Sequence, residues 1–344
     1  MRIDGSYGEG GGQIVRSAVA LSALTGQEIR IENVRAKRGK QGLAAQHLTA
    51  VMGVAALCDG EVDDGFIGST SIGFRPGRAI GGRYELDVGT AGSVTLVLQA
   101  CMLASVRAPM ATELEIKGGT NVRMSPPVDY YIEVLLPLLN RMGLDAEMEV
   151  LSRGFYPQGG GAVRVILPPA PALHPLDLPE RGKLEEVGGT AFAQNLPEHV
   201  GQRLGHAARK ALLGHDLRLH TERTAGHSTG AGLSLYARYQ NTVLGANALG
   251  EKGVPAEKVG EEAAERLKEE MEGPGTLDVH AADQLVAYMA LADRPSHFIV
   301  SEVSTHLSTQ MWLLRQFLPV EFQEHALDDG TLVEVEPSRT SREG

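Results

Sequence analysis

A histidine near the C-terminus of this sequence stands where a helix could activate it as a nucleophile. His306 lies in the stretch 303–312, where Ser304 or Thr305 is suited to cap a helix that has His306 in its first turn. The positive end of the helix dipole disfavours the imidazolium, so the ring would stay neutral and nucleophilic, and the same dipole would attract a phosphate group. The alternative is a capped surface histidine, one of eleven in the chain.

A glycine-rich stretch at the other end of the chain could cradle phosphates. Residues 5–13 read Gly-Ser-Tyr-Gly-Glu-Gly-Gly-Gly-Gln and precede an apolar helix that contains Arg16. Backbone N–H groups in such a loop and at a helix start can face an anion. The stretch matches neither the P-loop nor the dinucleotide-binding fingerprint, and a structural turn is the alternative. Glu9 has no apolar packing role among these glycines and suggests a ligand for a hard metal ion.

Two further turns and one basic run could add to such a site. Residues 87–93 open a second apolar helix, and 118–121 lead through Pro126 and Pro127 to a third. Several helix starts could then converge on a polyphosphate. Five basic side chains lie within eleven residues and could hold a nucleic-acid end, or form a solvated face: Arg30, Arg35, Lys37, Arg38 and Lys40.

The elements that would position these residues recur along the chain. Six times, an apolar helix with small residues is followed by a turn and a short strand. The pairs are 17–24 with 28–34, 43–57 with 61–66, 94–105 with 113–117, 130–142 with 145–151, 283–291 with 297–303, and 308–317 with 322–326. Gly26 and Gly143 stand where left-handed helix C-caps are expected. The pattern predicts an α/β (α+β) fold of repeated units, with helices on one face of the sheets.

A change of amino-acid composition between the fourth and fifth helix–strand pairs predicts an inserted domain. Prolines are frequent over 168–179, and Glu-Gly-Pro-Gly at 272–275 closes the stretch. We expect a small α/β domain at 181–276, with helices at 198–213 and 256–271 and strands at 216–220 and 233–239. The ends of an insertion usually lie close together, so 1–180 and 277–344 would form one large catalytic domain.

The composition is that of a globular protein of 344 residues, 42% hydrophobic and 22% charged. We expect no membrane segment, because no apolar run approaches ~20 residues, and a cytoplasmic location, because the N-terminus lacks signal-peptide features. Cys58 and Cys101 have small apolar neighbours, which favours reduced, buried thiols. A net charge of −11 argues against an undirected nucleic-acid binder.

In combination, the motifs resemble those of RNA 3′-terminal phosphate cyclases. The run 8–17, followed by Arg-Ala-Lys-Arg at 35–38 and by 42–50, is similar to the family's N-terminal signature. Motifs at 89–99, 118–120, 126–127, 154–157, 282–285 and 306–309 follow in the family's order. The resemblance covers almost the whole chain and is weakest in the expected insert. It implies a core of repeated βαβαββ-type units that is interrupted by a small α/β domain.

The resemblance also implies an ATP-dependent activity on RNA. His306 matches the family's nucleophile, which attacks the α-phosphorus of ATP, expels pyrophosphate and becomes histidyl–AMP. The adenylyl group then passes to an RNA 3′-phosphate, and the neighbouring 2′-OH closes a 2′,3′-cyclic phosphodiester as AMP leaves. A divalent ion, Mg or Mn, would offset phosphate charge. The expected partner is RNA with a 3′-phosphate end; the oligomeric state stays open.

Site residues follow from the resemblance, position by position. Glu9 would bind the metal, and Arg35 and Arg38 would contact the RNA phosphate, since the guanidinium fork can grip phosphate oxygens in pairs. The positions expected around the nucleotide are Gln13, Arg16, Gln46, Gln99, Pro126, His280, Asp283 and Gln284. Many relatives carry a tyrosine at the position of His280, opposite Pro126 in the adenine slot, and imidazole offers less area for stacking.

Two other interpretations compete with this one. A non-catalytic relative could bind RNA or protein in ribosome assembly, since fold alone does not fix function. Such relatives lack the histidine and parts of the metal and nucleotide site, all present here as His306, Glu9, Arg16 and Asp283. An enolpyruvyl-transferase-like enzyme has similar repeated units, but its small-molecule site would not explain a histidine at a helix start beside an acidic metal residue.

Overall fold

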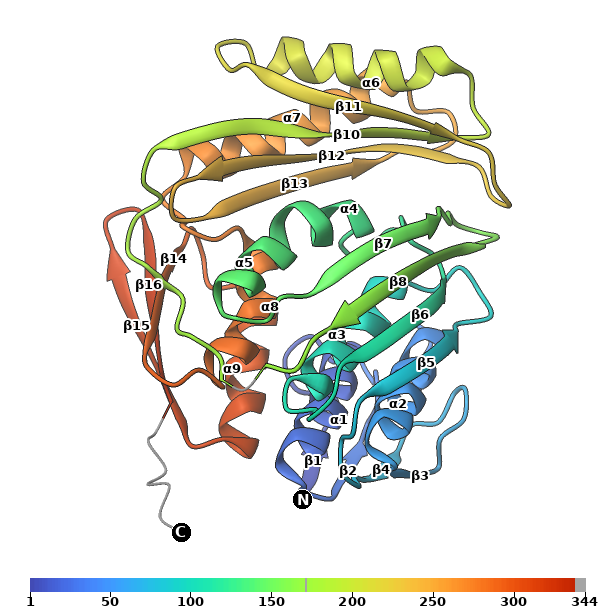
Figure 1. Ribbon diagram of the computed structural model, residues 1–344, viewed down its shortest axis with the longest axis vertical. Helices are drawn as coiled ribbons and strands as arrows, with labels where there is room; N and C mark the ends of the chain where they lie inside the picture. Colours follow the sequence, from blue (N-terminus) through green and yellow to red (C-terminus); the bar gives the residue numbers. More distant parts are fainter. Residues whose placement is uncertain (171, 338–344) are drawn as a thin grey trace.

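The computed structural model describes residues 1–170 and 172–337, which form four four-stranded sheets covered by helices (Figure 1). Three of the sheets share one topology. In each, the chain runs strand, helix, strand, helix, strand, strand, and the strands lie side by side in the order first, second, fourth, third. The first two strands are parallel and the other neighbours antiparallel. The predicted α/β class and the repeated units are confirmed. Each of the three units contains two of the six predicted helix–strand pairs.

The first unit carries the glycine-rich loop between its first strand and first helix. It consists of β1 (Arg2–Asp4), α1 (Gln13–Thr25), β2 (Ile29–Glu32), α2 (Ala45–Cys58), β3 (Glu61–Asp63) and β4 (Ile72–Arg75). The C-cap of α1 is Gly26 in the left-handed region, with φ 71°, as its position in the sequence predicts. Cys58 at the end of α2 is free and buried, and so is Cys101.

The second unit contains a helix with a π-helical segment in its middle. It consists of β5 (Gly82–Asp87), α3 (Val94–Ser105), β6 (Thr112–Gly118), α4 (Val128–Tyr130), the π-helical η1 (Tyr131–Leu135), α5 (Leu136–Arg141), β7 (Glu147–Ser152) and β8 (Gly161–Leu167). The predicted helix over 130–142 is present, but five of its residues are π-helical rather than α-helical. Pro137 has no N–H to donate to the preceding turn, so the α-helical ladder cannot run through this position.

The third unit is split by the fourth sheet. It consists of β9 (Asp177–Leu178), α8 (Val279–Met289), β14 (Ser296–Val300), α9 (Thr305–Phe317), β15 (Val320–Leu327) and β16 (Gly330–Pro337). Between β9 and α8 lie β10 (Leu184–Gln194), α6 (Glu198–Ala211), β11 (Leu217–Thr224), β12 (Gly230–Tyr239), β13 (Val243–Leu249) and α7 (Ala256–Glu272). This sheet has a different strand order, β11-β10-β12-β13, and its own hydrophobic cluster.

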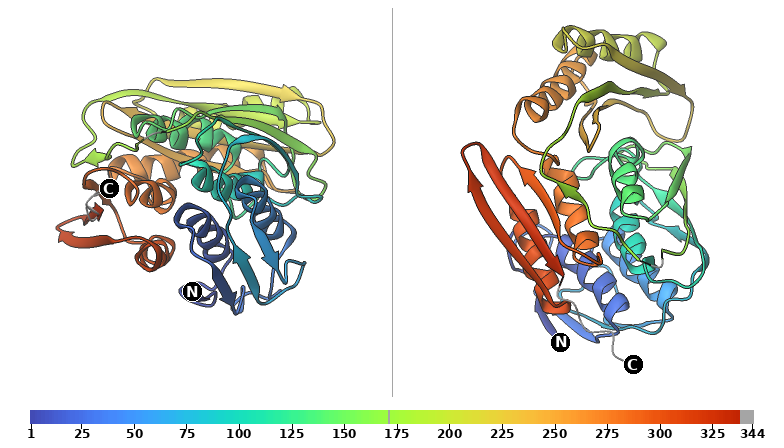
Figure 2. Two further views of the ribbon diagram at one scale, coloured as in Figure 1. Left: turned by 60° about the horizontal axis from the view of Figure 1, so that its bottom comes forward. Right: turned by 60° about the vertical axis from the view of Figure 1, so that its left-hand side comes forward.

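The helices of the three similar units lie inside, and their sheets lie outside (Figure 2). Helix α1 contacts α2, α3 and α9, and α8 contacts α9, so helices from all three units meet in one hydrophobic core. The start of α1 and the start of α9 therefore come from opposite ends of the chain but from neighbouring helices.

Within the described residues no helix has the length and apolar character to cross a membrane.

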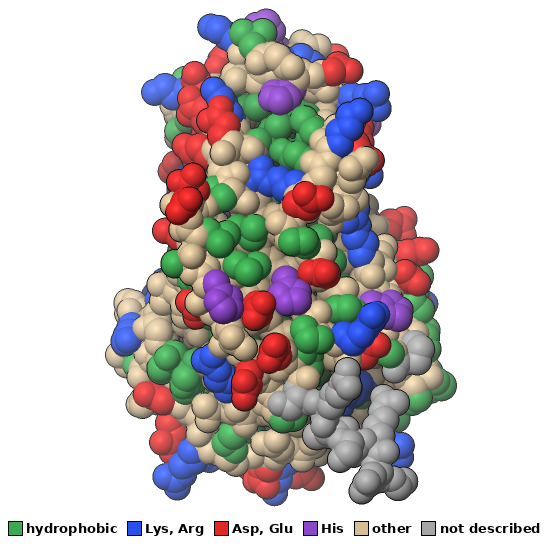
Figure 3. All heavy atoms as spheres, turned by 90° about the vertical axis from the view of Figure 1, so that its left-hand side faces the viewer, with side chains coloured by type: hydrophobic (Ala, Val, Ile, Leu, Met, Phe, Trp, Pro, Cys, Tyr) green, Lys and Arg blue, Asp and Glu red, His purple; other side chains and the backbone are tan. Residues whose placement is uncertain are grey.

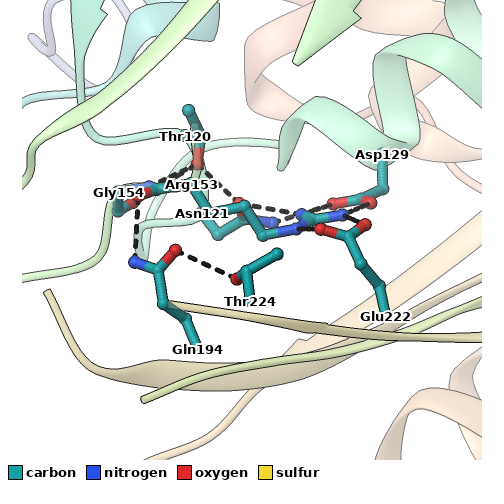
Figure 4. Close-up of polar contacts among 8 residues, drawn as sticks. All are labelled: Thr120, Asn121, Asp129, Arg153, Gly154, Gln194, Glu222 and Thr224. Carbon is teal, nitrogen blue, oxygen red and sulfur yellow. Dashed lines mark hydrogen bonds and ion pairs between the residues drawn. The ribbon is translucent and has the colours of Figure 1, made fainter. Parts of the chain in front are cut away.

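A buried ion-pair network joins the fourth sheet to the second unit (Figure 4). Arg153, only 4% exposed, donates to Asp129 on α4 and to Glu222 on β11, with N–O distances of 2.7 and 2.8 Å. Its Nη1 atom also donates to the Asn121 side chain. Breaking such a buried pair leaves an unpaired charge and typically costs about 3–5 kcal/mol. Arg153 therefore resists separation of the two parts of the molecule.

Candidate active site

His306 is the second residue of α9, and the start of this helix is capped as the sequence predicts. The Ser304 hydroxyl accepts a hydrogen bond from the N–H of Leu307 at 2.9 Å. The same hydroxyl donates to a carboxylate oxygen of Asp283 at 2.6 Å. Asp283 lies on α8, so the Ser304 hydroxyl links the first turn of α9 to the neighbouring helix. This link fixes the position of His306.

The side-chain amide of Gln13, at the start of α1, fixes the orientation of the His306 ring. Its nitrogen donates to the His306 carbonyl at 3.0 Å and to Oε1 of Gln310 at 3.3 Å. Its oxygen therefore faces Nδ1 of His306, at 2.8 Å. An amide oxygen can only accept, so Nδ1 carries the proton in this arrangement and Nε2 keeps its lone pair.

Burial and neighbouring charges keep His306 neutral. Partial burial lowers the pKa of its imidazole most, and the positive charges of Arg16 and Arg38 and the nearby His280 lower it further, while Glu9 opposes them. A lowered pKa leaves the ring unprotonated at neutral pH. With 45% of its side chain exposed, His306 is both neutral and accessible, which are the requirements for a nucleophile.

Glu9 from the glycine-rich loop faces the free nitrogen of this ring. One of its carboxylate oxygens lies 3.5 Å from Nε2 of His306 and 2.8 Å from Nη2 of Arg38. A lone pair and a carboxylate oxygen repel each other, so a positive charge between them would be stabilised. The side chain is 39% exposed and can therefore reach a bound molecule.

The glycine-rich loop packs too closely against its neighbours for larger residues. Gly8 has φ 57°, and a Cβ there would collide with the Thr309 hydroxyl on α9. A Cβ on Gly12 would collide with the His47 ring. The Gly8 carbonyl accepts from the Lys37 ammonium at 2.8 Å. Gly12 caps α1 without a side-chain hydrogen bond, so the first N–H groups of this helix are not occupied by a cap.

Two basic groups lie beneath the loop in different protonation states. Arg16 is 7% exposed, and its Nε donates to Oε1 of Gln99 at 3.2 Å. Burial lowers its pKa to about 10, so the guanidinium stays charged at neutral pH. Burial and the charges of Arg16 and Arg35 lower the pKa of His47 to about 3. His47 is therefore a neutral neighbour, and Arg16 supplies a fixed positive charge.

The expected nucleotide positions divide into exposed and buried groups. His280 is exposed in the first turn of α8, with its ring edge-on to Tyr130 at 6.1 Å, and it is close enough to influence the charge of His306. Pro126 is half-buried, and its carbonyl accepts from the Thr95 hydroxyl at 2.8 Å. The Gln46 oxygen accepts from the N–H of Ser93 at the start of α3.

Gln284 and Arg35 are held by the protein itself. Gln284 is 8% exposed, and its side-chain oxygen lies 2.6 Å from the Tyr131 hydroxyl. Arg35 donates to the Gly42 carbonyl at 2.8 Å. The structure thus brings Glu9, Gln13, Arg38 and His306 into direct contact, whereas Gln284 bonds to Tyr131 and one nitrogen of Arg35 bonds to Gly42.

Three residues join the site without having been predicted there. Gln310 accepts from both Gln13 and Ser17, and its place one turn after His306 was the available signal. Lys37 was recognised only as part of a basic run and of the motif at 35–38. His47 was recognised only as part of a motif.

The donor set at Glu9 fits a divalent cation that is shared with a phosphate. Among the described residues, no group of three or more His, Cys, Asp or Glu could hold a metal ion. Mg²⁺ typically uses one or two carboxylates together with substrate phosphates and water, which one carboxylate satisfies. The Glu9 carboxylate is 39% exposed and can supply this one ligand.

Comparison with known proteins identifies relatives that match almost the whole chain. A family model described as RNA 3′-terminal phosphate cyclase matches residues 7–323. The RNA 3′-terminal phosphate cyclase of Methanopyrus kandleri is 46% identical over 98% of this chain and 99% of its own length. Those of Nitrosospira multiformis and Pyrobaculum neutrophilum are 47% and 44% identical, covering 93% and 98% of this chain and 92% and 98% of their own lengths.

Proposed function

This chain belongs to the RNA 3′-terminal phosphate cyclase family of enzymes, and we propose that it uses ATP to close an RNA 3′-phosphate into a 2′,3′-cyclic phosphodiester through a covalent intermediate on His306. The observation that carries the proposal is the pair of contacts on the His306 ring. Gln13 holds Nδ1, and Nε2 faces Glu9 with a free lone pair. The proposed substrates, ATP and RNA, are available in the cytoplasm, where we place the protein.

In the first proposed step, Nε2 of His306 attacks the α-phosphorus of ATP. A nitrogen–phosphorus bond forms, and the bond to the β-phosphate oxygen breaks, so pyrophosphate leaves with the electron pair. The ring gains positive charge, and its Nδ1–H points at the Gln13 oxygen, which stabilises that charge. Arg16 and Arg38 supply positive charge where the phosphates gather.

In the second step, an oxygen of the RNA 3′-phosphate attacks the same phosphorus. The nitrogen–phosphorus bond breaks, and Nε2 regains its lone pair. In the third step, the 2′-hydroxyl oxygen attacks the activated 3′-phosphorus, loses its proton, and AMP leaves. A divalent cation at Glu9 would supply charge neutralisation on the phosphates. AMP is a better leaving group than a free phosphate oxygen, so each displacement has a manageable barrier.

We propose that the nucleotide lies between α1, α9 and the start of α8. The base would lie between His280 and Pro126, near Gln46, Asp283 and Gln284, and the phosphates would lie over Arg16 and Gln99. The positive starts of α1 and α9 both favour an anion there. Arg35 and Arg38 would receive the RNA phosphate. The support is that Asp283 bonds to Ser304 at the start of α9, and that the charges of Arg16, Arg38 and His280 act on the His306 ring.

The decisive experiment is covalent labelling with ATP that carries radioactive phosphorus at the α-position. With Mg²⁺ or Mn²⁺, the protein is expected to acquire AMP, and His306→Ala none. A phosphoramidate is cleaved by acid and survives alkali, unlike an ester on Ser304. RNA with a 3′-phosphate should discharge the label and acquire a cyclic end, whereas RNA with a 3′-hydroxyl should not.

The matched control is His199→Ala, which changes an exposed histidine at the same position of α6. It should label like the unchanged protein. Label that is absent, acid-stable or retained in His306→Ala would contradict the proposal. An RNA- or protein-binding role in ribosome assembly would then be the better interpretation.

A further inference from the structure

A cleft separates the tip of the β7–β8 hairpin from the sheet between β9 and α8. One wall consists of Asn121, Arg123, Phe155 and Tyr156. The other wall comes from the ends of β12 and β13, at 229–231 and 249–252. The cleft continues past Tyr156 to the starts of α6 and α7, at Val200 and Ala256. It is therefore a groove along the boundary between two parts of the molecule.

One end of this groove is lined by a residue that we propose lies near the nucleotide. Gln46 and Ala91 line it there. The next residue after Gln46 is His47, whose ring packs against Gly12 at the start of α1. An RNA whose 3′ end is bound at the proposed nucleotide site beside Gln46 would therefore enter the groove at this end.

The width of the groove is fixed by the buried network drawn in Figure 4. Arg153 precedes Gly154 and Phe155 in the hairpin and bonds to Asp129, Asn121 and Glu222. Gln194 on β10 donates to the Arg153 carbonyl at 3.0 Å. The Ser228 hydroxyl donates to the Gly159 carbonyl and accepts from the N–H of Phe155. Both walls are thus held together at their base by hydrogen bonds.

The side chains in the groove are suited to a single nucleic-acid strand. Tyr156 is 79% exposed at the tip of the hairpin, which leaves its aromatic face free for a base. The charged residues that line the groove are Arg123, Arg203, Lys252 and Glu251. Three of these four are basic, whereas the chain has a net charge of −11.

Two of these basic groups already have acidic partners. Arg123 pairs with Glu251, and Arg203 pairs with Glu257. All four of these side chains are more than 40% exposed, and ion pairs between exposed side chains contribute little to stability. A phosphate can therefore compete for the guanidinium groups. Lys252, exposed next to Glu251, adds a third positive charge.

We propose that this groove binds the single-stranded RNA that leads into the 3′-phosphate end, with Tyr156 stacking on a base and Lys252 and Arg123 contacting phosphates. This inference rests on the proposed function. A duplex is not the occupant for which the exposed ring is suited, because paired bases already stack on each other. The chemical class is single-stranded RNA of any sequence, since every base has a face on which an aromatic ring can stack.

The test separates RNA binding from the first chemical step. Protein is first labelled with AMP, and discharge of the label is then followed in a single turnover. The substrates are a dinucleotide and a decanucleotide, both with 3′-phosphates. The decanucleotide should discharge the label at a lower concentration, because only it can reach the groove beyond Gln46. Self-labelling needs no RNA and should be equal in all groove variants.

Tyr156→Ala should raise the decanucleotide concentration needed for half-maximal discharge by about fivefold to a hundredfold, and leave the dinucleotide value unchanged. Tyr156→Phe should keep the advantage of the longer RNA. Lys252→Glu should weaken decanucleotide discharge and reduce its dependence on salt. The controls are Leu213→Ala and Lys210→Glu, which change exposed residues at the end of α6, outside the groove.

Two failures can be told apart. If the unchanged protein does not label with AMP, the proposed function is wrong. If labelling is normal but the decanucleotide has no advantage, or keeps its full advantage in Tyr156→Ala combined with Lys252→Glu, the groove does not bind the RNA strand.

Discussion

The side-chain oxygen of Gln13 lies 2.8 Å from Nδ1 of His306, while the nitrogen of the same amide donates to the His306 carbonyl. One side chain therefore holds both the ring and the backbone of the proposed nucleophile. The two donor bonds of the amide nitrogen prevent it from turning over, so its oxygen stays directed at the ring. The protonation of the ring is set by packing between α1 and α9.

Gln13→Ala should slow self-adenylylation by about tenfold to a hundredfold. The variant loses a hydrogen bond to a ring that becomes charged during the reaction, and such bonds contribute about 1.5–3 kcal/mol. The ATP concentration at half-maximal rate should change less than the rate itself. Single-turnover labelling measures both, and Gln202→Ala on the exposed face of α6 serves as the control. Unchanged labelling would show that the reaction does not depend on Gln13 to orient the His306 ring.

Glu9→Gln should reduce self-adenylylation by at least about a hundredfold, because the site loses its cation-binding charge. Glu9 is 39% exposed, so the melting temperature should change by no more than about 2 °C. Labelling across a series of Mg²⁺ and Mn²⁺ concentrations, with melting curves on the same samples, makes the comparison. Glu61→Gln changes another exposed carboxylate paired with arginine and should label normally. Full activity with the same metal dependence would exclude the metal role.

Asp283→Asn should change how stability depends on pH. Burial raises the pKa of Asp283 most, with Asp278 and Glu9 adding to the rise and the Ser304 hydroxyl opposing it, to about 7 from the ordinary 3.8. Between these values the folded protein keeps a proton that the unfolded chain releases. Folding is therefore penalised as pH rises from about 4 to about 7.

The asparagine variant lacks this penalty and can still accept from Ser304. Its free energy of unfolding, minus that of the unchanged protein, should rise over this range by on the order of 3 kcal/mol and then level off. Urea unfolding at several pH values measures the difference, in which the titrations of other groups cancel. Asp64→Asn, at an exposed pair with Arg30, should show no such rise. A flat difference for Asp283→Asn would mean that Asp283 is ionised throughout.

His280→Tyr should bind ATP about twofold to tenfold more tightly. The phenol ring offers more stacking area opposite Pro126, and an aromatic contact is worth about 0.5–1.5 kcal/mol. Calorimetric titration in the His306→Ala background measures affinity without turnover. His280→Ala should bind more weakly than the histidine form. If tyrosine abolishes binding in a folded protein, His280 has another role than flanking the base.

Local signals in the sequence predicted the features of the site that depend on short segments. Ser304 before an apolar helix predicted the cap, and Gly26 predicted the end of α1. The six helices and their following strands were predicted for the same reason, since each has its own apolar pattern. The class of the fold followed from their repetition.

Features that depend on distant contacts could not be predicted in this way. Gln310 bonds to Gln13 only because α1 and α9 pack side by side. The apolar periodicity of neither helix predicts that the two helices pack against each other. Strands such as β8 and β16 were missed because their positions depend on pairing partners rather than on a helix before them. Only two of the four strands of the fourth sheet were predicted from the sequence. Strand β10 was missed because glycines and charged residues interrupt its apolar pattern.

The candidate site is divided between the first and third units, and this division has a consequence during synthesis of the protein. Glu9 and Gln13 are synthesised long before His306. Early segments of a chain can fold while later ones are still being made. A growing chain can therefore form the loop that would receive phosphates, but it contains no residue to accept AMP. On the proposed function, an unfinished or prematurely ended copy consumes no ATP, and the activity appears only when α9 has packed against α1.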